Sequence, residues 1–148
     1  EGPFASYAGL RDVQRLVAEG KPDEARQRAR SLFVEFPSLP VAYRLARLFE
    51  EAELSREARE ALKFIRFIQV FSIDEMALVS QIAELLHRNE ASPLAISLFE
   101  IMLEERNLPK GLRMALLEKG AKIAGEASEL RFAFDWTFEL QQLRAPPQ

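Results

Sequence analysis

One pair of residues has a spacing typical of metal chemistry: Glu84 and His87, in the stretch Glu84-Leu-Leu-His87. On a helix, residues three positions apart share a face, so the carboxylate and the imidazole would lie side by side. Carboxylate-bridged di-iron bundles use this spacing, but each centre needs two such pairs and further carboxylates. Because His87 is the single histidine of the chain, that centre cannot be completed. We therefore predict no metal site and no cofactor, and we interpret the pair as part of a polar helix face.

The sequence also gives little support for nucleophilic catalysis. It contains no cysteine, and no serine lies in the glycine-flanked G-x-S-x-G turn that exposes a nucleophile. A phosphate-binding glycine loop is absent as well, because the six glycines are scattered. The serines lie near expected helix boundaries, where helix capping accounts for them. They are Ser6, Ser38, Ser55, Ser72, Ser92 and Ser128. We predict that the chain is not an enzyme and has no catalytic residue.

The composition indicates a folded domain that neither binds nucleic acid nor inserts directly into a membrane. The chain has 148 residues, 48% of them hydrophobic, and a net charge of -3. A nucleic-acid binder needs a positive field to release counterions from phosphates, so we predict no nucleic-acid partner. No apolar run reaches the roughly 20 residues of a membrane-spanning helix, so we predict no direct membrane insertion. The chain lacks an initial methionine and ends in the linker-like RAPPQ, and we interpret it as an excised domain or a processed chain.

Residues that start or stop helices recur at regular distances along the chain. Proline suits the first turn of a helix, and serine or asparagine suits the position before it. Between these breaks, apolar residues recur at three- and four-residue spacing, as in Leu45, Leu48 and Phe49, and no strand-like alternation is sustained. We therefore predict an all-α chain of about eight helices. The breaks lie at 20–23, 37–40, Ser55, 72–75, 92–93, 107–109 and Gly125.

Small residues repeat at the same place in successive helix pairs. An alanine lies near the start of every second predicted helix, at intervals of 33, 37 and 32 residues. Another alanine lies twelve positions before each of the last three. Small side chains at these places allow paired helices to approach closely, so the repeat has a packing cause. The first set is Ala25, Ala58, Ala95 and Ala127, and the second is Ala46, Ala83 and Ala115.

The stretch EGKPDEARQRARSLFVEFP, residues 19–37, resembles the tetratricopeptide repeat family. It has a glycine in the turn, Asp-Glu-Ala at the start of the second helix and a closing proline, and the stretches 45–65 and 82–102 keep parts of the same motif. The resemblance implies a right-handed α-solenoid of about four helix-turn-helix units within a single domain, 1–148. The units would cover about 4–37, 39–71, 74–106 and 109–144, followed by a tail at 145–148. A generic α-solenoid and a closed helical bundle with duplicated hairpins remain open as alternatives.

The resemblance also implies a binding site, because in this family the first helix of each pair lines a concave groove for peptides or partner helices. Transferring the groove positions relative to Ala46 and Ala83 selects four residues in each of the second and third units. Their mixed character suits a peptide whose apolar anchors are flanked by charges. The alternative is that they are ordinary solvent-facing residues and that the partner docks elsewhere. The selected residues are Tyr43, Arg47, Glu50, Glu51, Ser80, Glu84, His87 and Arg88. We predict a non-catalytic scaffold or adaptor for a protein or peptide partner.

A second hypothesis is a structural module that self-associates, as a homo-oligomer, or docks on its parent protein. It would use the apolar surfaces of the predicted helices at 55–71 and 126–144. The stretch KFIRFIQVF, residues 63–71, offers apolar contact on every side of a helix, with Phe67 and Phe71 as candidate contacts. In the last helix most of the aromatic residues are expected in the core, and any that point outward would mark a contact surface. These aromatic residues are Phe132, Phe134, Trp136 and Phe138.

Overall fold

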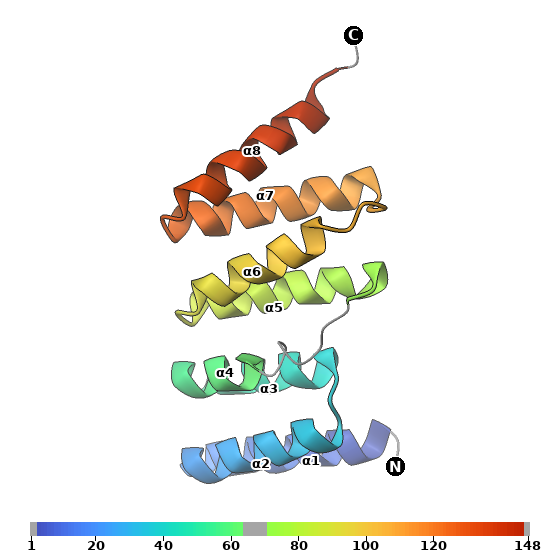
Figure 1. Ribbon diagram of the computed structural model, residues 1–148. Coiled ribbons are helices and arrows are strands. Elements are labelled where there is room, and N and C mark those ends of the chain that lie inside the picture. The colour runs from blue at the N-terminus through green and yellow to red at the C-terminus, as the bar shows by residue number, and fades with distance from the viewer. Residues whose placement is uncertain (1–2, 64–70, 147–148) are drawn as a thin grey trace. The chain divides into compact units, whose positions relative to one another are not determined.

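The computed structural model describes residues 3–63 and 71–146, and over these ranges the chain is helical, without any strand (Figure 1). This confirms the prediction of an all-α chain, with eight α-helices and one short 3-10 helix in the described residues. The elements are α1 (Pro3–Ala18), α2 (Pro22–Glu35), α3 (Leu39–Glu51), α4 (Ser55–Leu62), the 3-10 helix η2 (Ile73–Glu75), α5 (Met76–Arg88), α6 (Ser92–Leu103), α7 (Lys110–Glu126) and α8 (Leu130–Arg144). None of the helices described is long and apolar enough to cross a membrane.

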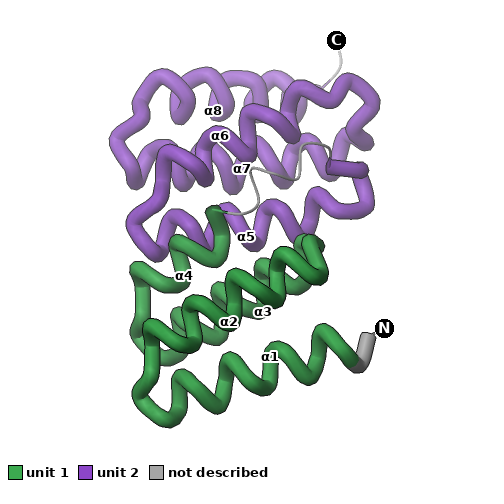
Figure 2. The backbone as a smooth tube through the Cα atoms, turned by 60° about the horizontal axis from the view of Figure 1, so that its bottom comes forward, with its two compact units in different colours: residues 1–70 green, residues 71–148 purple. Residues whose placement is uncertain are grey.

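The helices pack in sequence-adjacent pairs, as expected for an all-α helical repeat. The pairs are α1 with α2, α3 with α4, α5 with α6, and α7 with α8. The chain divides into two compact units, residues 1–70 and 71–148, each holding two pairs (Figure 2). This division falls between the second and third predicted repeats. The handedness of a solenoid and the grouping of four repeats into a single domain stay predictions.

The turn inside each pair has the same backbone geometry. One residue has a positive φ, and the N–H of the next residue donates to the carbonyl oxygen five positions earlier, which is the closure of a Schellman motif. The positive-φ residues are Gly20 (74°), Glu53 (62°), Glu90 (65°) and Ser128 (62°). The closing bonds run from Lys21 to Leu16 (3.0 Å), Leu54 to Phe49 (2.9 Å), Ala91 to Leu86 (2.8 Å) and Glu129 to Ala124 (2.8 Å).

The helix ends show that the predicted break at Gly125 is wrong. Helix α7 continues through Gly125 to Glu126, and α8 begins only at Leu130. Ala127 therefore follows α7 instead of opening the next helix. Ala133 takes its place, because it is the fourth residue of α8 just as Ala95 is the fourth of α6. The intervals between the four turn residues are 33, 37 and 38 positions.

The small residues of the first three repeats are buried, as the sequence predicted. Ala25, Ala58 and Ala95 have no exposed surface, and neither do Ala46 and Ala83. The predicted Ala115 is exposed instead, because the register of the fourth repeat was misplaced. In α7 the close approach is made by Gly120, where an added Cβ would lie 3.1 Å from the rings of Phe99 and Trp136.

Several predicted helix starts are confirmed and two are not. The Ser38 hydroxyl accepts a bond from the Val41 N–H at 3.3 Å, and Ser72 forms a capping box with Glu75. Ser55 and Ser92 make no capping bond, because each is the first residue of its helix and not the residue before it. Prolines lie in the first turns of α2, α3 and α6, as predicted.

Only Lys63 and Phe71 of the stretch KFIRFIQVF belong to the described residues. Phe67 lies outside them, whereas Phe71 is half-buried in the second unit. Of the late aromatic residues, Trp136 is buried against Phe99, with ring centroids 6.3 Å apart. Phe134 and Phe138 are exposed, so only part of the aromatic group lies in the core as expected.

The energetic cost of the left-handed conformation at a turn can be tested by substituting Glu53. We expect Glu53→Gly to raise the free energy of unfolding by about 0.5–1 kcal/mol. Glycine removes the steric cost of a Cβ at positive φ, and this gain exceeds the loss that comes from the greater conformational entropy of the unfolded chain. Urea denaturation would measure the change. Glu53→Ala is the control, since it removes the carboxylate but keeps the Cβ. An equal gain from both substitutions would contradict the backbone explanation.

Candidate functional site

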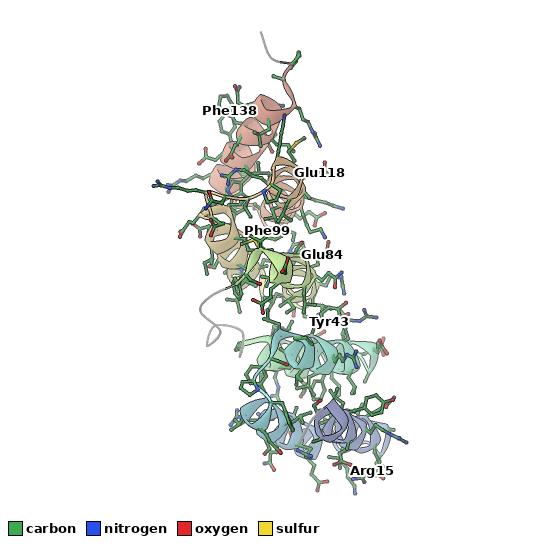
Figure 3. All side chains as sticks on the ribbon, turned by 90° about the vertical axis from the view of Figure 1, so that its right-hand side faces the viewer. Arg15, Tyr43, Glu84, Phe99, Glu118 and Phe138 are labelled. Atoms are coloured by element: carbon green, nitrogen blue, oxygen red, sulfur yellow. The ribbon has the colours of Figure 1, made fainter. Side chains whose placement is uncertain are left out.

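A hollow of about 240 Å³ lies between α5 and α7 in the second unit. Ile123 is its buried apolar residue, and charged or polar side chains make up the rest of the lining. The lining residues are Glu84, His87, Arg88, Lys119, Lys122, Ile123 and Glu126. Three of the groove residues selected from the sequence therefore meet in one place, and Figure 3 labels one of them, Glu84, on α5.

Helical spacing explains why these residues share the hollow. On α5, Glu84, His87 and Arg88 are three and four positions apart, so they occupy one face. The opposite side of α5 carries Ile82, Leu85 and Leu86, which are almost completely buried. The lining residues of α7 follow the same spacing, at positions 119, 122, 123 and 126. Burial of one face of α5 thus directs the polar face toward α7.

Two polar contacts join the helices at the hollow. The Lys119 Nζ lies 2.8 Å from the Glu84 Oε1, with both side chains 37% exposed. The His87 Nε2 lies 2.8 Å from the Glu126 Oε1. Partly exposed pairs of this kind contribute little to stability individually, on the order of 0–1 kcal/mol. Their main effect is to hold the side chains in defined positions.

His87 is fixed through both of its ring nitrogens. Its Nδ1 lies 2.7 Å from the Ser92 Oγ at the start of α6. The Glu126 carboxylate can only accept, so Nε2 carries a hydrogen, and in the neutral ring Nδ1 accepts from the serine hydroxyl. This assignment follows from the hydrogen-bond partners. One imidazole therefore connects α5, the start of α6 and the end of α7.

The order serine, imidazole, carboxylate is also the order found in enzymes with an activated serine. Here, however, Ser92 is not among the residues that line the hollow, so a molecule held there would not be held against its hydroxyl. We interpret the three residues as a polar tie between helices. Among the described residues, no three His, Asp or Glu side chains are grouped so that they could hold a metal ion.

The hollow has a small excess of positive charge. Arg88, Lys119 and Lys122 contribute three cations, against the two carboxylates of Glu84 and Glu126. Lys119 is paired with Glu84, and Glu126 accepts from His87. Lys122 is exposed and makes no ion pair within the described chain. An anionic group entering the hollow would therefore meet one ammonium group with no carboxylate partner.

The predicted residues of the second repeat form a separate polar row on α3. Arg47 donates to the Tyr43 hydroxyl and to the Glu51 carboxylate, both at 3.2 Å. Its guanidinium carbon also lies 6.0 Å from the centroid of the Tyr43 ring. The hydrogen bond to Tyr43, followed by smaller electrostatic contributions, raises the pKa of Arg47 above its ordinary value, so the group stays charged. Glu50 lies on the same helix and is half-buried.

The remaining predicted residues differ in accessibility. Ser80 is only 6% exposed, so it belongs to the core of the second unit and not to a surface that a partner could touch. Phe71 is half-buried. The α3 residues belong to the first unit and the α5 residues to the second, and each set is considered by itself.

The α7 half of the hollow was not predicted, because the groove positions were transferred only to the second and third repeats. The turn residues Glu90 and Ser128 are 38 positions apart. When the α5 residues are moved by this interval, Glu84 corresponds to Lys122 and Arg88 to Glu126, and both line the hollow. The correct repeat interval would therefore have identified half of the missing lining. Ser92 was assigned to capping, so its bond to His87 was missed as well.

A double-mutant cycle tests the tie between His87 and Ser92. We expect His87→Ala to lower the free energy of unfolding by about 1–2 kcal/mol and Ser92→Ala by about 1 kcal/mol. The double variant should lose less than the sum of the two, because both remove the same hydrogen bond. Urea denaturation provides all three values. Ser97→Ala is a matched control on α6, since Ser97 donates to Pro93 instead, and strict additivity for Ser92 would show that the contact is unimportant.

No family model, curated protein or solved structure matches this chain. The function proposed next is therefore supported by the side chains of the candidate site.

Proposed function

We propose that the chain is a non-catalytic protein-interaction domain, built from repeats like those of the tetratricopeptide family, and that it binds an extended segment of a partner protein. The observation that carries the proposal is the α5–α7 hollow, which combines a buried apolar residue with charges of both signs. Mixed surfaces of this kind are typical of sites that recognise protein segments. Three of its residues, Glu84, His87 and Arg88, are among those that the resemblance to this family selects as groove positions.

The size of the hollow favours a side chain over a cofactor. Pockets for small molecules commonly occupy about 300–1,000 Å³ and enclose most of the ligand. At about 240 Å³ and between two helices, this hollow is smaller than that range. It suits individual side chains of a segment that continues along the surface.

The lining indicates which side chains those would be. Ile123 is almost completely buried, so an apolar group would pack mainly on the methylene stems of the long side chains around it, and an adjacent carboxylate can pair with the Lys122 ammonium. Glu84 and Glu126 on the rim disfavour a run of acidic residues, because like charges repel at close range. The best partner is therefore a segment with an apolar anchor next to an acidic residue. The Tyr43–Arg47–Glu51 row is a second proposed contact surface.

The proposal can be tested with displayed random peptides selected on the immobilised protein. Selected peptides are then synthesised with a fluorophore and titrated by fluorescence anisotropy. We expect Lys122→Glu to raise their Kd about tenfold, because a cation facing the peptide becomes an anion. The thermal midpoint should not change, since Lys122 is exposed and makes no ion pair within the described chain.

Lys110→Glu is the matched control for this experiment. It makes the same charge change on the same helix, at an exposed residue outside the hollow. Equal weakening by the two substitutions would mean that the peptides respond to overall charge and not to the hollow. A selection that enriches no peptide would count against peptide binding at this surface.

A further inference from the structure

The outer face of α8 carries three large apolar side chains in solvent. Leu130 is 70% exposed, Phe134 71% and Phe138 55%. They are four positions apart, so they form one stripe along the helix, and Figure 3 shows Phe138 at its far end. The other side of α8 is anchored by Trp136 and Leu140, which are buried. Large apolar side chains that are lined up in water in this way often mark an interaction site.

Two opposite charges border one edge of this stripe. Arg131 and Asp135 are exposed, one helical turn apart, and lie roughly 60–100° around the helix from Phe134 at about 100° per residue. At this spacing they could pair with each other, yet neither makes an ion pair with any described residue. The Arg131 guanidinium carbon instead lies 5.9 Å from the centroid of the Phe132 ring. The edge therefore offers an unpaired cation and an unpaired anion.

We propose that the α8 stripe is a self-association surface whose occupant is the same helix of a second copy of the chain, packed antiparallel about a two-fold axis near Phe134. In that arrangement Phe134 faces its own counterpart and Leu130 faces Phe138 of the other copy. The two-fold also brings Arg131 of each copy to Asp135 of the other. An edge that carries a positive and a negative side chain one helical turn apart is therefore complementary to the same edge of a second copy.

The charge pattern favours a second copy over an unrelated partner. A partner with an acidic or a basic surface would satisfy one of the two charges and oppose the other. The two-fold pairing satisfies both with no additional residue. Three side chains per copy bury less than the roughly 1,200–2,000 Å² of a standard interface, so the dimer should be weak, with a Kd on the order of 10–100 µM.

Sedimentation equilibrium over a concentration series tests the proposal. The average mass of the wild-type chain should rise from 16.9 kDa toward twice that value as the concentration increases. Phe134→Glu should abolish the rise, because it places two like charges at the centre of the pairing. Val34→Glu is the matched control, since Val34 is an equally exposed apolar residue, at 72%, in the other unit. A chain that stays monomeric well above 100 µM would overturn the proposal, as would equal loss from both substitutions.

A charge exchange identifies the pairing itself. Arg131→Asp makes both flanking residues acidic and Asp135→Arg makes both basic, so each variant alone should associate about tenfold more weakly. An equimolar mixture of the two should recover association, because each acidic edge then meets a basic edge. The double variant should recover it as well. Failure of the mixture to associate would exclude the antiparallel pairing.

Discussion

The hydrogen bond that closes each helix pair determines where the first helix ends and the second begins. The backbone N–H of one residue donates to the carbonyl oxygen five residues earlier, and the residue just before the donor has the left-handed conformation. In the second unit, the bond from Ala91 to Leu86 encloses the segment that holds His87, and it places Ser92 beside the imidazole. The bond from Glu129 to Ala124 ends α7 just past Glu126, the second partner of His87. Two backbone turns thus assemble one side-chain tie.

The same turns mark the limit of what the sequence predicts about the fold. Apolar spacing and first-turn prolines located the helices, because both follow from helix geometry. Gly20 indicated the first turn, since glycine adopts positive φ without steric cost. Glu53, Glu90 and Ser128 adopt it against their own preference, held by the surrounding hydrogen bonds. Gly125 misled the prediction in the opposite direction. It lies within the last turn of α7, but a glycine there resembles the end of a helix in the sequence.

The half of the candidate site that could be predicted is the half reached from a correctly aligned repeat. Ala83 is correctly placed, so the groove positions counted from it reached Glu84, His87 and Arg88. No groove position was transferred to the fourth repeat, whose alignment on Ala127 falls beyond the end of α7. Lys122 and Glu126 were therefore not selected. Burial of Ser80 could not be foreseen either, because it depends on how closely the neighbouring helices approach.

The hollow and the α8 stripe differ in how their charges are used. In the hollow, Glu84 and Glu126 already have partners on the opposite helix, so the lining is held in place before any ligand arrives. Binding there loses little side-chain freedom, and selectivity comes from the shape and from the excess cation. On α8, Arg131 and Asp135 lack ion-pair partners within the described chain, and the apolar stripe beside them is exposed. Its charges and apolar side chains gain partners only when a second copy covers the stripe, so the fraction of paired chains should depend on protein concentration. The hollow, by contrast, is already formed in a single chain.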